Sequence, residues 1–372
     1  MKRKWTLAVG ALGLLAALPA SADRSTAQFT SVTVFGDSLV DAGNLYIANG
    51  GTRPDPSQGY FQNRFTDGFD YPDLISLKLF GVPTTPSLAG GSNYAFGGAR
   101  VVDTGDAIPD LGAQLSTFAA SGKPVDPNGL YILNFGGNDV FGAEGVFGPD
   151  GAIGTYPDVS SYLEAAANQY VAGIKALNDR GVRNILFTDF PNAADPLTVE
   201  ANGYLRTALN GLSLSAGTDL YFYSLSDFNV RVLQHPDQFG LPPLRATPSC
   251  VAAGAQASGC EGYFSFDGVH VTGAVQAAGF RDMDQRFGLT SAVPEPSVWT
   301  MLILGFGMVG AALRHGRRRR VAAASAARPT DLLRIRSRVR RCATRFAAIV
   351  PAAPGRGWRD ARAIPAPIAE SR

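Results

Sequence analysis

Residues 31–44 read Ser-Val-Thr-Val-Phe-Gly-Asp-Ser-Leu-Val-Asp-Ala-Gly-Asn. The first five, Ser31–Phe35, form a run of mostly β-branched and aromatic residues, which is typical of a strand covered on both faces. A Gly-Asp-Ser turn follows directly. Because ligands of parallel sheets bind beyond the C-terminal ends of the strands, this stretch predicts a buried strand that presents Ser38 at the functional edge of a sheet.

The rest of the chain up to about residue 290 alternates between strand-like and helix-like segments. Three later runs have the composition of strands covered on both faces: Leu130–Phe135, Asn184–Thr188 and Leu220–Ser224. Predicted helices lie between and after them: Tyr71–Phe80, Leu111–Ala120, Val159–Arg180, about Leu197–Leu214 and Ala274–Phe287. This alternation predicts an α/β domain with a mainly parallel sheet and right-handed crossovers.

A serine hydroxyl is a weak nucleophile until a base takes its proton, so Ser38 directs attention to the three histidines. His315 lies in an arginine-rich segment, and His235 precedes a proline in a loop-like stretch, where a surface histidine is expected. His270 has Asp267 three residues before it, and positions three apart share one side of a turn. We predict that His270 is the base and that Asp267 fixes its tautomer, with His235 as the rival base.

Two further segments could stabilise a tetrahedral intermediate, which needs hydrogen-bond donors aimed at its oxyanion, each worth about 3 kcal/mol of barrier. Asn93–Ala99 (NYAFGGA) offers glycine N–H groups, and Gly136–Asp139 (GGND) offers an amide side chain after a predicted strand. Both segments are predicted to be loops.

Together these segments resemble the GDSL family of lipases and esterases, also called SGNH hydrolases. The similar blocks are, in order, Val34–Asn44, Asn93–Ala99, Gly136–Asp139 and Asp267–His270. Asn63–Gly68 also resembles a segment common in the larger bacterial and plant-type members. The resemblance spans about Val32–Phe287. It implies a three-layer α/β/α sandwich of the flavodoxin-like kind and cleavage of carboxylic esters through an acyl-enzyme.

The same resemblance implies a role for each matching residue. Ser38 would be the nucleophile, His270 the general base and then acid, and Asp267 its orienting partner. The oxyanion would be held by the Ser38 N–H, by the Gly98 N–H (with Gly97 as the alternative) and by the Asn138 side chain.

Other catalytic motifs are missing from the sequence. No Gly-x-Ser-x-Gly occurs, which argues against the α/β-hydrolase nucleophile elbow. No HExxH, Cys/His cluster or phosphate-binding glycine loop occurs either. We therefore expect a site that needs no metal and no cofactor.

The N-terminus has the layout of a secretory signal peptide. Lys2–Lys4 is followed by the apolar run Trp5–Leu18 and then by small residues up to Ala22, which predicts removal of residues 1–22. The alternative is an N-terminal membrane anchor. Export would permit a disulfide between Cys250 and Cys260, ten positions apart, although two free thiols remain the alternative.

A second predicted targeting signal lies near the C-terminus. Val298–Leu313 carries no charge, follows Val293–Pro296 (VPEP) and precedes the arginines of residues 314–320. This order resembles the PEP-CTERM sorting signal of Gram-negative bacteria. The resemblance implies recognition by an exosortase and release or anchoring at the cell surface, with a membrane segment within residues 293–320. The basic tail, residues 321–372, is predicted to be disordered, and residues 23–292 form the predicted hydrolase domain.

Charge is distributed unevenly along the chain. Arg314–Arg372 holds 16 arginines against three acidic residues, and residues 1–22 hold three basic residues and no acid. Residues 23–313 therefore carry 14 basic and 28 acidic residues, although the whole chain has a net charge of +2. An acidic domain repels nucleic-acid phosphates, so nucleic-acid binding is not expected.

Three functions remain open at this point. The first is an exported serine esterase or lipase acting on small-molecule or lipid esters, and the second is an acyltransferase or phospholipase that uses the same acyl-enzyme. The third is a non-catalytic surface-anchored binding protein, which would have no need of Ser38, Asn138, Asp267 and His270 together. The loops Tyr46–Phe61 and Phe141–Tyr156 are expected to form the pocket walls.

Overall fold

The computed structural model describes residues 29–146, 153–192, 194–290, 306–310 and 314 of the 372-residue chain. The chain divides into two units, Met1–Val293 and Pro294–Arg372. In the second unit, residues 306–310 are helical and exposed. No helix among the described residues combines the length and apolarity needed to cross a membrane. The predicted signal peptide, most of the predicted sorting segment and the basic tail lie outside the described residues.

A parallel sheet forms the centre of the first unit. Its strand order, within the described ranges, is β1-β2-β3-β4. The strands are β1 (Val32–Gly36), β2 (Leu130–Asn134), β3 (Asn184–Thr188) and β4 (Asp219–Tyr223). Each predicted strand is observed to within about one residue, and the prediction of a mainly parallel sheet is confirmed.

The five predicted helices are also present. They are α2 (Tyr71–Phe80), α3 (Leu111–Ala120), α5 (Val159–Asp179), α6 (Pro196–Asn210) and α8 (Gly273–Phe287). Three helices were not predicted: α1 (Asn44–Ala48), α4 (Gly137–Ala143) and α7 (Leu225–Gln234). The prediction of a loop at Gly136–Asp139 is wrong, since Gly136 is the N-cap of α4 and the next three residues form its first turn.

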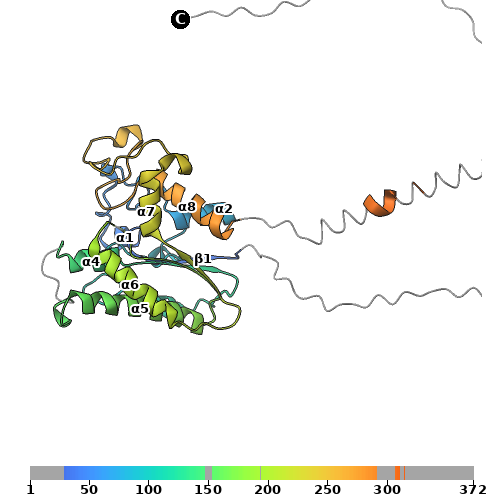
Figure 1. Ribbon diagram of the computed structural model, residues 1–372, viewed down its shortest axis with the longest axis horizontal. Helices are drawn as coiled ribbons and strands as arrows, with labels where there is room; N and C mark the ends of the chain where they lie inside the picture. The colour runs from blue at the N-terminus through green and yellow to red at the C-terminus, as the bar shows by residue number, and fades with distance from the viewer. Residues whose placement is uncertain (1–28, 147–152, 193, 291–305, 311–313, 315–372) are drawn as a thin grey trace, which may run out of the picture. The chain divides into compact units, whose positions relative to one another are not determined.

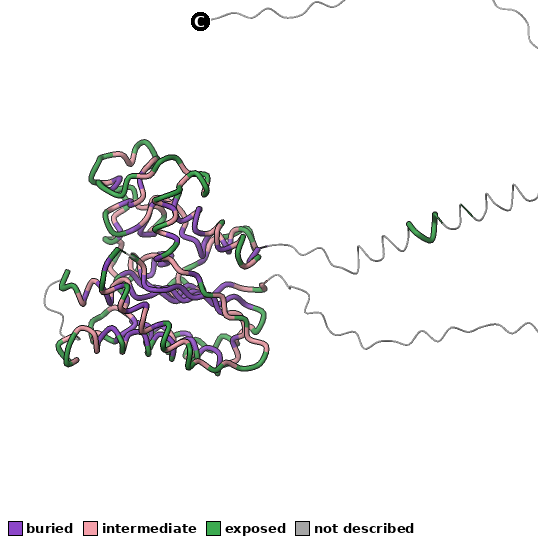
Figure 2. Tube along the Cα trace, in the orientation of Figure 1, coloured by how far each residue is buried: buried purple, intermediate pink, exposed green. Residues whose placement is uncertain are grey.

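Helices cover both faces of the sheet. Successive strand residues point to opposite sides, so Leu130 and Ile132 pack with residues of α2, α7 and α8, while Tyr131 and Leu133 pack with residues of α3, α5 and α6. Figure 1 shows α5 and α6 on one side of the sheet and α7 and α8 on the other. Strands β1, β2 and β3 are almost entirely buried, and Figure 2 shows buried residues along the centre of this unit. The unit is an α/β/α sandwich, as predicted.

The two outer strands differ in how they are covered. Within the described part of the chain β4 pairs only with β3, and of its five residues only Tyr223 is buried, so the prediction that this strand is covered on both faces is wrong. Along β1 the backbone of residues 92–96 pairs in parallel: the Val34 N–H donates to the Ser92 carbonyl, and the Phe96 N–H donates to the Gly36 carbonyl. The segment Asn93–Ala99 is therefore fixed against β1 as far as the end of that strand.

Candidate active site

The Gly-Asp-Ser turn is held by its own hydrogen bonds at the end of β1. The Asp37 N–H donates to the Asn134 carbonyl at the end of β2, and the Val40 N–H donates to the Asp37 carbonyl. The Leu39 N–H donates to the Asp37 carboxylate at 3.0 Å. Ser38 is therefore presented, half-buried, at the C-terminal edge of the sheet.

Ser38, His270 and Asp267 form one continuous hydrogen-bonded chain. The His270 Nε2 lies 2.7 Å from the Ser38 Oγ, although the two residues are 232 positions apart. The His270 Nδ1 lies 2.6 Å from the Asp267 Oδ2. The other oxygen of Asp267 accepts the N–H groups of Val269 and His270. The loop before α8 thus brings a base to the hydroxyl and a carboxylate to the base.

The environment of Asp267 keeps its carboxylate ionised. Burial alone would raise its pKa, but the hydrogen bond and charge of His270, together with the two backbone N–H groups, lower the pKa well below its usual value. An ionised carboxylate accepts the Nδ1 proton and leaves the Nε2 lone pair facing Ser38. This arrangement suits proton abstraction from the serine.

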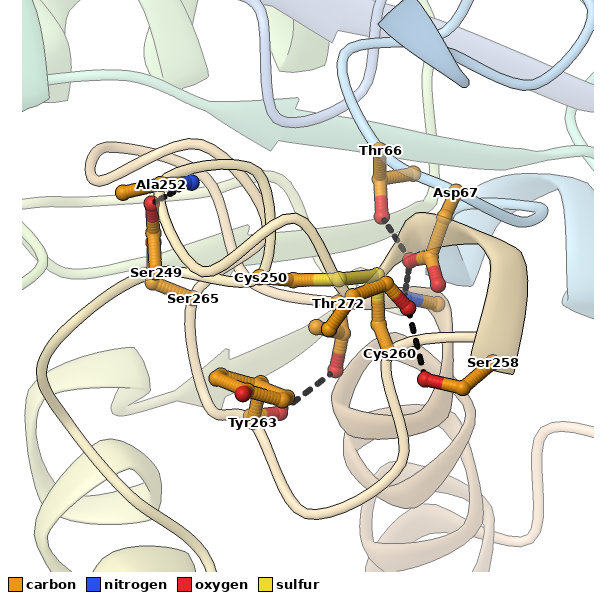
Figure 3. Close-up of a disulfide and its surroundings, with 12 residues drawn as sticks. Thr66, Asp67, Ser249, Cys250, Ala252, Ser258, Cys260, Tyr263, Ser265 and Thr272 are labelled. Carbon is orange, nitrogen blue, oxygen red and sulfur yellow. Dashed lines mark hydrogen bonds between the residues drawn. A yellow bond between two sulfur atoms is a disulfide. The ribbon is translucent and has the colours of Figure 1, made fainter.

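The histidine loop is fixed by the segment Asn63–Gly68, which the sequence singled out only by resemblance. The Thr66 hydroxyl donates to the Val271 carbonyl at 2.8 Å, and the Gly273 N–H donates to the Asp67 carboxylate at 2.6 Å. Figure 3 shows Thr66 and Asp67 beside the loop that carries Thr272. A Cβ on Gly273 would lie 2.8 Å from the Gly68 Cα, so the two segments approach so closely that glycine is required.

A disulfide stabilises the residues that lead into the loop carrying Asp267 and His270. Cys250 and Cys260 are bonded (Figure 3) and form a small buried cluster with Tyr263 and Phe266. The Cys250 N–H donates to the Ser265 carbonyl. The open question of free thiols is therefore resolved in favour of a bridge, and the bridge anchors the residues directly before Asp267.

Tyr60 is a member of the site that the sequence analysis missed. Its hydroxyl donates to the Asp267 Oδ2 at 2.8 Å, the same oxygen that faces the His270 Nδ1. Its ring packs edge-to-face on Phe266, with centroids 4.9 Å apart. Burial and the Asp267 carboxylate raise the pKa of Tyr60, so the hydroxyl remains a donor. Because the contact spans 207 positions, no local pattern points to it.

Replacement of Tyr60 by phenylalanine should move the acid limb of the pH–rate profile to higher pH by up to about one pH unit. The physical reason is that Asp267 loses a donor, keeps more negative charge and favours the protonated imidazole. Rates on the high-pH plateau should change less than rates below the limb. The measurement is kcat/KM for an ester as a function of pH.

The matched control for this variant is Tyr223→Phe. Tyr223 donates to Asp282 at the same distance of 2.8 Å, so its loss removes an equivalent tyrosine–aspartate bond that does not involve His270. An unchanged limb in Tyr60→Phe, or an equal shift in both variants, would contradict a positioning role for Tyr60.

The predicted oxyanion donors are only partly brought together. The Asn138 side chain lines the same cleft as Ser38 and His270. It donates one amide hydrogen to the Ala99 carbonyl, and the other has no acceptor among the residues that the structure describes. Asp41 accepts the Gly97 N–H at 2.9 Å, which leaves Gly98 as the available glycine. Gly98 is exposed but does not line the cleft. Among the described residues, neither the Ser38 nor the Gly98 N–H donates to another protein atom.

Asp37 is a second titratable group beside the nucleophile. Burial, together with the charge of Asp139, raises its pKa to about 7 against opposing hydrogen bonds from the Leu39 N–H and the Asn134 side chain. An experiment on the pH dependence of this site must therefore distinguish the contribution of Asp37 from that of His270.

A cleft of about 430 Å³ opens beside Ser38 and His270. Its walls come mainly from α7, from α8 and from the segments that follow β3 and precede α8. Of the two loops expected to form the walls, only Phe141 contributes among their described residues, so that expectation is largely wrong. Tyr60, near the end of the loop Tyr46–Phe61, instead donates a hydrogen bond to the Asp267 carboxylate and does not line the cleft.

The remaining candidates do not join this constellation. His235 is exposed at the C-terminal end of α7, outside the cleft, and His315 lies outside the described residues. In the described part of the chain, no group of three or more His, Cys, Asp or Glu side chains is placed to hold a metal ion.

Two family models match parts of the chain, and the chain is also similar to bacterial proteins. The family model described as GDSL-like Lipase/Acylhydrolase matches residues 32–282, and the PEP-CTERM protein-sorting motif matches residues 292–319. Lipase 1 of Photorhabdus luminescens is 36% identical over 141 residues, which is 38% of this chain and 20% of that protein. The thermolabile hemolysin of Vibrio parahaemolyticus is 29% identical over 170 residues, which is 45% of this chain and 35% of that protein. The chain thus matches about a third or less of the length of these two relatives. An alpha/beta hydrolase enzyme from the metagenome of Lake Arreo has a TM-score of 0.42 at 16% identity, covering 72% of this chain and all of that one.

Proposed function

The chain belongs to the GDSL-like lipase/acylhydrolase family, and on that premise we propose that it is an exported serine esterase that cleaves carboxylic esters through an acyl-enzyme on Ser38. The observation that carries the proposal is the chain of short contacts from the Ser38 hydroxyl through His270 to Asp267. A binding protein would have no physical need of this arrangement beside an open cleft.

The first half of the reaction forms the acyl-enzyme. The His270 Nε2 takes the hydroxyl proton as the Ser38 oxygen attacks the ester carbonyl carbon, and the carbonyl electron pair moves onto its oxygen. The N–H groups of Ser38 and Gly98 and the Asn138 amide would stabilise this oxyanion. When the oxyanion collapses, the bond to the alcohol oxygen breaks, and the leaving alkoxide takes the proton from His270.

The second half repeats these steps with water. His270 removes a proton from water, the hydroxide adds to the acyl carbon, and collapse returns the proton to the Ser38 oxygen as the acid leaves. Asp267 remains ionised throughout and stabilises the imidazolium formed in each half, in keeping with its lowered pKa.

The sorting motif at residues 292–319 indicates export in a Gram-negative cell. We further propose removal of residues 1–22 as a signal peptide, transient membrane attachment through residues 293–320 and processing by an exosortase-type enzyme. These steps would place the esterase domain at the cell surface or in the periplasm.

The acyl-enzyme itself can be tested by partitioning. The purified chain is given phenyl, nitrophenyl and methyl esters of one acid in the presence of a fixed amount of butanol, and the free acid and butyl ester are quantified. Because all three substrates pass through one acyl-enzyme, the ratio of the two products should be identical for each. Ratios that depend on the leaving group contradict the proposal, and products consisting almost wholly of butyl ester would favour acyl transfer over hydrolysis.

A further inference from the structure

Residues Phe96–Ala99 form a tight turn at the end of β1. The Phe96 N–H donates to the Gly36 carbonyl at 3.0 Å, and the Ala99 N–H closes the turn by donating to the Phe96 carbonyl at 3.1 Å. Gly98, the third residue of the turn, has φ of 91°. This positive φ is that of a type II turn, whereas a type I turn has a negative φ here and its central peptide faces the opposite way. The φ of Gly98 therefore sets the direction of its own N–H.

The turn adjoins the other groups of the site. Asn138, which lines the cleft, donates from its side chain to the Ala99 carbonyl at 2.9 Å. A Cβ on Gly97 would lie 2.6 Å from the Phe65 ring, so the backbone of the turn packs directly on that ring. The same ring lies beside the His270 imidazole, with centroids 5.1 Å apart. The turn is thus fixed next to both the amide and the base of the site.

Asp41 is buried and holds the turn at Gly97. Its Oδ2 accepts the Gly97 N–H at 2.9 Å and the Leu45 N–H at 3.1 Å. Its Oδ1 accepts the N–H groups of Gly43 and Asn44 at 2.8 and 2.6 Å. Three of these four donors belong to the start of α1, and capping of that helix accounts for them. Capping does not account for the fourth, because Gly97 is 56 positions away from Asp41.

The position and the direction of one N–H are controlled separately in this arrangement. The bond from Gly97 to Asp41 fixes where the central peptide of the turn lies, and the φ of Gly98 fixes which way that peptide faces. A hydrogen-bond donor contributes to catalysis only when it is aimed at the oxyanion, and loss of one donor costs about 10²–10³ in kcat. Asp41 does not line the cleft, so it can act only through the backbone that it holds.

We propose that Asp41 is a positioning residue of the reaction: its bond to the turn keeps the Gly98 N–H facing the oxyanion formed at Ser38. The proposal rests on the esterase function proposed above and adds a residue that sets the rate without touching the substrate. Within the described residues, Asp41 neither lines the cleft nor hydrogen-bonds the catalytic histidine. Its loss should therefore lower kcat and leave both KM and the acid limb of the pH profile unchanged.

The test combines a substitution of Asp41 with substitutions of Gly98. Asp41→Asn keeps one carbonyl oxygen, which can accept only one pair of the four N–H groups. In Gly98→Ala the new Cβ meets only Ile108, at 3.9 Å, but alanine disfavours a positive φ, so the turn should favour the form whose N–H faces away. Gly98→Asn is the milder variant, because asparagine tolerates a positive φ better than alanine does.

Each substitution has a matched control outside the site. Gly181, just after α5, has φ of 106°, and a Cβ on it would meet only Val125, also at 3.9 Å, so Gly181→Ala repeats the change made in Gly98→Ala. Asp195 caps α6 by accepting two backbone N–H groups, so Asp195→Asn removes a comparable carboxylate. Neither control residue lines the cleft. Both control variants should keep the kcat of wild type.

The readouts are kcat and KM for a nitrophenyl ester, the acid limb and the thermal midpoint of unfolding. Gly98→Ala should lower kcat about 10²-fold, Gly98→Asn less, and Asp41→Asn about tenfold, with KM within about twofold of wild type. The variant with both Asp41→Asn and Gly98→Ala should be no slower than Gly98→Ala alone, because both changes act through one N–H. A merely structural role of Asp41 would instead multiply the two losses to about 10³-fold.

The outcomes separate this proposal from the proposed function. Multiplied losses in the double variant, the wild-type kcat in Asp41→Asn, or an equal loss of kcat in Asp195→Asn overturns the role of Asp41 while ester hydrolysis at Ser38 stands. If Asp41→Asn does not fold, Asp41→Ser, whose hydroxyl oxygen remains an acceptor, decides by the same criteria. If wild type hydrolyses no ester and an alkyl fluorophosphonate does not label Ser38, both proposals fail.

Discussion

Replacement of Ser38 by alanine should reduce ester hydrolysis on the order of 10⁶-fold while leaving the fold intact. The loss is this large because the histidine, the carboxylate and the oxyanion donors act only through the serine oxygen. The fold should survive because Ser38 is half-buried and, in the part of the chain that the structure describes, its hydroxyl hydrogen-bonds only His270, so its removal leaves no cavity in the core. Initial rates on a nitrophenyl ester and the thermal midpoint of unfolding measure the two effects.

The matched control is Ser116→Ala on α3. Its hydroxyl also makes one hydrogen bond, to the Gly112 carbonyl, but it is remote from the cleft. Activity should be unchanged in this variant. If Ser38→Ala hydrolyses esters at rates near those of wild type, Ser38 is not the nucleophile, even though it contacts His270.

Replacement of His270 by alanine should lower the rate by a similar factor and should also abolish the acid limb of the pH profile. A protonated imidazole cannot accept the Ser38 proton, so the wild-type rate should fall as the pH falls through the imidazole titration. Without the imidazole, the residual rate should lack this limb. The measurement is log(kcat/KM) against pH for both proteins.

Two further variants show which group produces the limb. Asp37 has a pKa of about 7 and lies beside Ser38, so its titration could also produce an acid limb. Asp37→Asn should retain the limb, and His235→Ala should leave the whole profile unchanged. A limb that disappears in Asp37→Asn but persists in His270→Ala would assign the titration to Asp37 and contradict the proposed role of His270.

The features that could be predicted from the sequence are those whose residues lie close together along the chain. β1 and the Gly-Asp-Ser turn adjoin one another, so a single pattern contains both the strand and the serine it delivers. β2 and β3 are visible because strands buried on both faces need continuous apolar runs. The pairing of Asp267 with His270 is local, since they are three positions apart in the sequence.

The features that could not be predicted depend on tertiary contacts or on glycine-rich starts. α4 begins at glycines that are typical of a turn, and Gly136, with φ of 108°, directs the chain into the helix. β4 has the composition of a covered strand but lies at an edge, which depends on what pairs beside it. The Tyr60–Asp267 contact and the cleft walls join segments far apart in the chain, so they leave no periodic signal.

The central claim, that Ser38 is the activated nucleophile, is tested most directly by reaction with a fluorophosphonate followed by mass spectrometry of the whole chain and of its peptides. We expect one adduct per chain, located at Ser38, absent from Ser38→Ala and formed far more slowly in His270→Ala. An adduct at another residue, or equal labelling of Ser38 with and without the His270 imidazole, would contradict the account.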